Sequence, residues 1–174
     1  MDEPLGSAPM LLPRLSASVP DYSREAKQWG AWVPSRSLLA SIRAFQRAQS
    51  SHAPWAPMLR RIAVLRHRFW SVVTGTDIPV TCRIGGGLLM PHPNGIVIHP
   101  DAQIGPNCLI FQQVTIGAAK GGVPRVGGHV DIGAGAKLIG PITVHDHACI
   151  GANAVVLIDV PAGATAVGNP ARIV

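Results

Sequence analysis

Residues 126–156 read VGGHVDIGAGAKLIGPITVHDHACIGANAVV, and a branched apolar residue returns at every sixth position of this stretch. The same period extends back to Ile78, with a two-residue slip near residue 96 and a second interruption after residue 116. The residues in register are Ile78, Ile84, Met90, Ile96, Ile98, Ile104, Ile110, Ile116, Val126, Ile132, Leu138, Val144, Ile150 and Val156. An α-helix has 3.6 residues per turn, so its apolar face would lose this register within two turns.

Glycine follows the apolar residue in many of these repeats, at Gly85, Gly105, Gly117, Gly127, Gly133 and Gly151. Repeats of an apolar residue, glycine and four further residues are typical of parallel β-helices, in which each hexad supplies one short strand and one corner. Three hexads close a coil of 18 residues. The 90 residues from 78 to 167 therefore predict about five coils, in a mainly β fold.

Two segments interrupt the period. One is the slip at residues 95–100. The other, residues 117–125 (GAAKGGVPR), adds four residues to the hexad count and is expected to leave the coil as a loop. Insertions in solenoids gather on one face, which is often the binding face. We therefore expect the second segment to lie near a functional site.

The chain before the repeats has a different character. Residues 1–21 contain four prolines and no periodicity, and we expect an unstructured leader there. Residues 22–76 predict a helical segment, with helices over about 22–29, from a Ser35 cap onward, and over about 58–73. The apolar positions of the last helix include Leu59, Ile62, Ala63, Leu65, Phe69 and Val73. Residues 77–174 form the predicted β-helix domain.

Composition limits the class of protein. The chain has 174 residues, 47% of them hydrophobic, and a net charge of +6. The excess of basic residues falls in residues 1–76, spread at helical spacing, and we interpret it as a solvated face, with an anionic ligand as the alternative. We expect no nucleic-acid and no membrane partner. The acidic N-terminus and three widely spaced cysteines predict a cytoplasmic protein without a disulfide framework.

Four stretches carry a resemblance to a known family. They are Gly87–Pro100 (GLLMPHPNGIVIHP), Gln112–Gly117 (QQVTIG), Ile132–Lys137 (IGAGAK) and Val167–Arg172 (VGNPAR). They resemble the serine acetyltransferase family, and more closely its branch in polysaccharide and secondary-metabolite pathways. The resemblance implies a left-handed β-helix, a homotrimer or a dimer of trimers, and acetyl-CoA bound between neighbouring β-helices.

The resemblance also implies the catalytic residues. The family's catalytic histidine matches His92, and its orienting aspartate matches Asp77, fifteen residues upstream. Transfer of an acetyl group to a hydroxyl needs a base for the alcohol proton, and imidazole titrates in the right range. A carboxylate on the other ring nitrogen fixes the tautomer. Backbone N–H groups near Gly117 are where the family stabilises the oxyanion.

In this family CoA is held by backbone groups and small residues on the later coils. The positions this implies are Gly117, Ala134, Lys137, Ala152, Pro170 and Arg172. Lys137 and Arg172 are expected either to pair with the nucleotide phosphates or to be solvated charges at the edge of the coils.

The sequence departs from the serine-specific enzymes at the acceptor side. Pro91 stands where they have an Asp, and Gly122 and Val123 stand where they have an Arg-His pair. These substitutions remove charged partners for an amino acid, although Arg125 can replace them in part. We therefore predict a small molecule or sugar as the hydroxyl acceptor, with serine as the alternative.

Two other classes of function remain as alternatives. Trimeric β-helices that bind zinc use a His-x4-His pair, whereas the spacings here are seven (His92 to His99) and two (His145 to His147), so no metal is expected. A non-catalytic β-helix scaffold would leave His92 as a structural residue and would not bind CoA. Whether His99, His129, His145 or His147 contributes to the site stays open.

Overall fold

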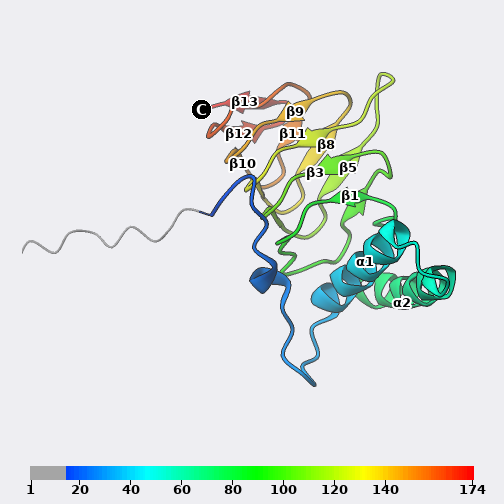
Figure 1. The fold of residues 1–174 in the computed structure, drawn as a ribbon. Coiled ribbons are helices and arrows are strands. Elements are labelled where there is room, and N and C mark those ends of the chain that lie inside the picture. Colours follow the sequence, from blue (N-terminus) through cyan, green and yellow to red (C-terminus); the bar gives the residue numbers. More distant parts are fainter. Residues whose placement is uncertain (1–14) are drawn as a thin grey trace, which may run out of the picture.

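The computed structural model describes residues 15–174. A short 3-10 helix, η1 (Tyr22–Glu25), is followed by two α-helices, α1 (Pro34–Ser50) and α2 (Ala56–Thr74), and then by thirteen short strands. Figure 1 shows the two α-helices side by side at the end of the strand stack where β1 lies. Among residues 15–174, no helix is long and apolar enough to cross a membrane.

The strands form three sheets that alternate along the chain. One sheet has the order β1-β3-β6-β9, the second β13-β12-β10-β7-β4, and the third β11-β8-β5-β2. All neighbours are parallel except β12 and β13, which form an antiparallel hairpin at the C-terminus. The bounds are β1 Arg83–Ile84, β2 Val97–Ile98, β3 Gln103–Ile104, β4 Leu109–Ile110, β5 Thr115–Gly117, β6 Arg125–Val126, β7 Asp131–Ile132, β8 Lys137–Ile139, β9 Thr143–Val144, β10 Cys149–Ile150, β11 Val155–Val156, β12 Thr165–Gly168 and β13 Ala171–Ile173.

The pairing register confirms the predicted coil length. Asp131 lies opposite Cys149, a separation of 149 − 131 = 18 residues. The separation is 22 between Gln103 and Arg125, because the four extra residues of the 117–125 segment lie between them. It is 20 between Arg83 and Gln103, where the two-residue slip falls. The chain is thus the predicted left-handed parallel β-helix of about five coils.

The inward side chains of the coils make the core. All fourteen residues of the predicted hexad register are buried, and none is more than 5% exposed. Leu38, Leu39 and Ile42 of α1 belong to the same apolar cluster, so α1 packs on the first coil. Burial of these branched side chains is the main stabilising contribution to the fold.

The helical segment differs from its prediction in two places. The first predicted helix is reduced to η1. The N-cap of α1 is Val33 rather than Ser35, and no side chain caps that helix. On α2 the buried residues are Ala56, Ala63, His67 and Thr74, whereas Leu59, Ile62, Leu65, Phe69 and Val73 are exposed. Small side chains let α1 and α2 approach closely, and the larger apolar residues are turned outward.

Residues 15–21 lie against the β-helix, although they fall within the leader that the sequence predicts to be unstructured. The buried Asn107 side chain donates to the carbonyls of Ser16 (2.7 Å) and Val19 (2.8 Å) and accepts from the amide of Asp21 (2.8 Å). These bonds replace the water that would otherwise satisfy a buried amide. The rest of the predicted leader, residues 1–14, lies outside the described residues.

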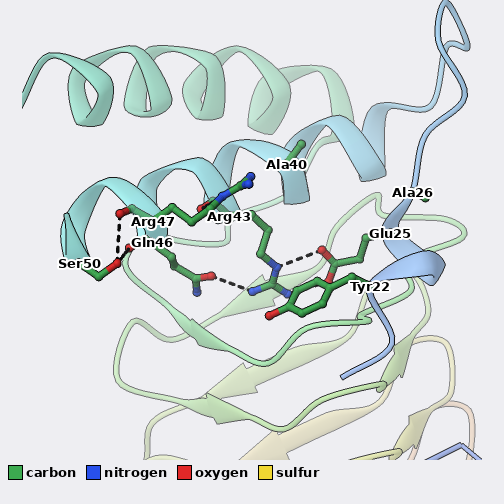
Figure 2. A pocket seen from close by; sticks show the side chains of 8 residues that line it. All are labelled: Tyr22, Glu25, Ala26, Ala40, Arg43, Gln46, Arg47 and Ser50. Atoms are coloured by element: carbon green, nitrogen blue, oxygen red, sulfur yellow. Dashed lines mark hydrogen bonds and ion pairs between the residues drawn. The ribbon is translucent and has the colours of Figure 1, made fainter. Parts of the chain in front are cut away.

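A buried ion pair joins η1, α1 and the first coil (Figure 2). The Arg43 guanidinium donates to both carboxylate oxygens of Glu25, at 2.7 and 3.0 Å, and both side chains are about nine-tenths buried. Arg43 also donates to the carbonyl of Ile84 at 2.6 Å, and Glu25 accepts from the amide of Gly87 at 2.7 Å. The pair therefore holds the helical segment on the open end of the β-helix.

Candidate active site

His92 lies in the corner turn that precedes β2, and its imidazole is exposed. It has no hydrogen bond or ion pair with any group in residues 15–174. A cavity of about 490 Å³ opens beside it. The cavity is lined by Trp32, Val33, Pro34, Ser35, Val73, Thr74, Pro91, His92, Pro93 and Asn94. It therefore lies between the start of α1, the end of α2 and the first coils. Among the described residues that line it, His92 is the one titratable group.

Backbone hydrogen bonds join the corner that carries His92 to the corresponding corners of the later coils. The amide of Gln113 donates to the carbonyl of Asn94 at 2.9 Å, and the amide of Gly135 donates to that of Gln112 at 2.8 Å. The amide of Asn153 then donates to the carbonyl of Ala134 at 2.8 Å. Successive coils are thus stacked directly on one another at this corner, from the turn that carries His92 to the later coils.

Ala134 and Ala152, two predicted CoA-binding residues, lie on this same corner. The two positions are in adjacent coils, and a Cβ placed on Gly133 would come within 2.6 Å of the Ala152 amide nitrogen. The backbones of adjacent coils therefore approach closely here, and the side chains at Ala134 and Ala152 are small. A long, thin ligand can follow such a surface closely, which is what CoA binding at these residues requires.

Asp77 lies fifteen residues before His92 in the sequence, but the two side chains do not interact. Its backbone bridges to Val97, and its carboxylate is exposed. No ion pair or hydrogen bond between the Asp77 and His92 side chains is present among the described residues. The orienting role of Asp77 therefore stays a prediction.

Gly117 and Lys137 lie on the sheet that follows the His92 corner. Gly117 in β5 is opposite Ile139 in β8. The Lys137 ammonium donates to the carbonyl of Gln113 (2.6 Å) and the hydroxyl of Thr115 (3.1 Å). The lysine is thus bound to the coil below, and it would have to leave these acceptors to meet a phosphate.

The last two predicted CoA residues lie at the C-terminal end of the β-helix. Pro170 and Arg172 are both exposed, and Arg172 belongs to β13. This hairpin extends the sheet β13-β12-β10-β7-β4, whose strands lead into the His92 corner. The structure places these two residues far along the solenoid from His92, so they would meet only a distant part of an extended ligand.

The 117–125 segment leaves the coil as a small hairpin, as predicted, visible in Figure 1 as the projecting yellow-green loop. Ala119 and Gly122 exchange two backbone hydrogen bonds of 3.0 Å around Lys120 and Gly121, which both have positive φ. Gly122, Val123 and Arg125 line a separate cavity of about 380 Å³. Within one copy of the chain, this cavity and the His92 cavity share no residue.

The cysteines do not supply a nucleophile. All three are free. Burial raises the pKa of Cys82 to about 12 and that of Cys108 to about 11, so both thiols stay protonated near neutral pH. Burial also raises the pKa of Cys149.

One histidine pair was not predicted. The Nδ1 atoms of His129 and His147 are 2.8 Å apart, with the rings at 72°. Their numbers differ by 18, one full coil, and this spacing was the signal that could have found them. No cluster of three or more His, Cys, Asp or Glu side chains that could hold a metal occurs among residues 15–174.

A larger cavity, of about 640 Å³, lies between η1 and α1 (Figure 2). Its buried charges, Arg43 and Glu25, satisfy each other. Because no buried charge is left unpaired there, we place the candidate active site at the smaller cavity beside His92.

Known proteins resemble the chain over most of its length, although no protein-family model matches it. It is 40% identical to a probable serine acetyltransferase 1 of Oryza sativa subsp. japonica over 134 residues, which are 75% of this chain and 44% of the relative. It resembles the structure of a serine acetyltransferase in complex with CoA, with 36% identity, a TM-score of 0.68, and coverage of 82% of this chain and 57% of that one.

The soybean serine acetyltransferase apoenzyme is similar over a larger share of its own length. The identity is 36% and the TM-score 0.62, and the match covers 79% of this chain and 69% of that chain. The chain spans about half the length of the curated relatives it matches, between 40% and 62%.

Proposed function

The chain belongs to the serine acetyltransferase family, and from this premise we propose that it transfers an acetyl group from acetyl-CoA to a hydroxyl group of a small molecule. The observation that carries the proposal is the His92 corner. It combines an exposed imidazole, an adjacent cavity of about 490 Å³ and stacked coil corners that include the small residues Ala134 and Ala152. These features support the proposed roles of a base, an acceptor pocket and a surface for an extended thioester.

The proposed chemistry is direct attack. His92 accepts the proton of the acceptor hydroxyl as its oxygen attacks the thioester carbonyl, and the proton then passes to the departing thiolate of CoA. Asp77 is proposed to steady the imidazolium, which requires a movement of either side chain from its position in this structure. Backbone N–H groups near Gly117 are proposed to bind the oxyanion.

CoA is proposed to lie along the His92 corner, over Ala134 and Ala152. Lys137 and Arg172 are proposed partners of its phosphates, with Pro170 bordering the nucleotide end. Lys137 is the weaker of the two cations for this role, since its ammonium already has two acceptors. By resemblance to the family, the working form is proposed to be a homotrimer, with a dimer of trimers as the alternative.

The acceptor has two candidates. The relatives reported above are named serine acetyltransferases, which favours serine. The cavity beside His92 favours an uncharged hydroxyl compound such as a sugar, because no Asp, Glu, Lys or Arg among residues 15–174 lines it. A buried amino acid needs charged partners for its ammonium and carboxylate. The finer resemblance to the polysaccharide and secondary-metabolite branch has no support among those relatives. The uncharged acceptor rests on this cavity and on Pro91, Gly122 and Val123, which stand where the serine-specific enzymes have charged partners.

The test is release of free thiol from acetyl-CoA in the presence of serine, homoserine, sugars or nucleotide sugars, with binding of CoA measured by calorimetry. We expect one acceptor class to give turnover. Turnover with serine would decide for serine and against the uncharged acceptor. Absence of CoA binding would refute the proposal and favour the non-catalytic scaffold.

A further inference from the structure

Helix α2 has an apolar face on each side. The side that packs against α1 carries Ala56 and Ala63, which are nearly fully buried. The opposite side carries six large apolar residues at alternating spacings of three and four, which places them on one stripe of a helix. We call this stripe the outer seam: Trp55, Met58, Ile62, Leu65, Phe69 and Val72, each between 45% and 84% exposed.

The outer seam continues beyond the helix through a chain of aromatic contacts. Phe69 meets Trp70 edge to face at 5.0 Å between ring centroids, and Trp70 meets Trp32 at 5.4 Å. Trp32 is 71% exposed, and Trp29, in the same turn before α1, is fully exposed. The exposed apolar residues therefore extend beyond α2 to the turn before α1.

The charge around the outer seam has one sign. Residues 26–76 contain eight Lys and Arg residues and no Asp or Glu. Arg61, Arg66 and Arg68 are exposed on α2 and flank the seam on its two sides. The nearest acidic residues in sequence are Asp77, three residues beyond the end of α2, and Glu25, which is already paired with Arg43.

This charge pattern decides against a second copy as the occupant. Two outer seams brought together would place their flanking arginines against each other, and like charges at these positions oppose helix pairing. No acidic residue on α1 or α2 could compensate. The occupant must supply negative charge over a broad apolar surface.

We propose that the outer seam binds the surface of an anionic lipid bilayer. Helix α2 would lie in the plane of the interface, with the seam side chains at the boundary of headgroups and acyl chains and the arginines on lipid phosphates. Trp29, Trp32 and Trp55 suit this interface, because their rings are apolar and their N–H groups reach water. The proposal replaces the expectation of no membrane partner, in which the basic residues of the helices form a solvated face.

The test is flotation of the full chain with vesicles of phosphatidylcholine alone or mixed with phosphatidylglycerol, at low and high salt. Wild type is expected to float with the anionic vesicles only, and to be released by salt because screening weakens the arginine contacts. The paired variant Arg61→Gln/Arg68→Gln is expected to lower partitioning by about thirtyfold. Leu65→Ser/Phe69→Ser should lower it by at least about tenfold.

A matched control separates the outer seam from exposed apolar residues in general. Leu157 and Ile158 lie on the β-helix and are 53% and 46% exposed, so Leu157→Ser/Ile158→Ser should leave flotation unchanged. The proposal is overturned if wild type does not float, or if it floats equally with neutral vesicles. It is also overturned if the seam variant floats like wild type, or if that variant dissociates a soluble oligomer, which would show that a second copy covers the seam.

Discussion

The amide of Gly95 donates a 2.8 Å hydrogen bond to the carbonyl of Gly75, which fixes the end of α2 against the corner turn that carries His92. Gly75 ends the helix in the left-handed conformation, with φ of 65°. The helical segment is therefore a wall of the candidate active site, and we expect a change in its position to affect acetyl transfer there.

Replacing Gly75 tests this link. Gly75→Ala puts a Cβ within 2.8 Å of the side-chain Nδ2 of Asn94, beside His92, and adds the cost of a positive φ. We expect the free energy of unfolding to fall by about 1 kcal/mol, and thiol release to fall as well. Gly121→Ala is the control, because Gly121 has a φ of 75° but nothing within 4 Å of a new Cβ. If the control reduces thiol release as much as Gly75→Ala does, the Asn94 contact is not responsible.

The Arg43–Glu25 ion pair should matter for stability more than for binding. Arg43→Met leaves the Glu25 carboxylate buried without its partner, and we expect the free energy of unfolding to fall by about 3 kcal/mol. Urea denaturation measures this. The exposed Arg47 of the same helix is the control, with an expected change of about 0.5 kcal/mol or less for Arg47→Met. Equal losses in the two variants would contradict the role assigned to the pair.

His67 gives the fold a dependence on pH. It is 8% exposed on the buried side of α2, and burial lowers its pKa from the usual value of 6.5. The unfolded chain therefore binds this proton more readily than the folded chain, so stability is lost as pH falls through about 6.5 toward the lower folded pKa. We expect urea midpoints of wild type to fall more between pH 8 and pH 5.5 than those of His67→Leu. If the urea midpoints of the two proteins changed in parallel with pH, this role of His67 would be contradicted.

The three cysteines should differ in reactivity. Cys82 and Cys108 are buried, with pKa values raised to about 12 and about 11, whereas Cys149 is exposed. Because the thiolate is the reactive form, maleimide at pH 8 should label only Cys149 in the folded protein and all three in urea. Mass spectrometry of the labelled peptides reads the result. Rapid labelling of Cys82 in the folded state would show that the first coil opens.

The coils could be predicted because their hexad pattern can be read directly along the sequence. A hexad period states which side chains point inward, and all fourteen predicted residues, from Ile78 to Val156, are buried. The two interruptions also predicted the register changes, which appear as strand separations of 20 and 22 residues. The His129–His147 pair follows from the same 18-residue spacing, although it was not predicted.

The helical segment could not be predicted to the same depth. Helix α2 carries small apolar residues on one side and large ones on the other, and periodicity does not tell which side packs. Ala63 is buried while Leu65 is 64% exposed, because the small side lets α1 approach. The cavity beside His92 could not be predicted for a related reason. Trp32, Val73 and His92 lie far apart in sequence and meet only through the fold.

The central claim is that His92 is the base for acetyl transfer. The most direct measurement is thiol release by wild type and His92→Ala at saturating acetyl-CoA and acceptor, with CoA binding measured on the same samples. His99→Ala is the control, since His99 follows β2 but does not line the His92 cavity. We expect His92→Ala to lose at least about a hundredfold in turnover while CoA binding and the His99→Ala rate stay near wild type. Turnover that survives in His92→Ala would contradict it.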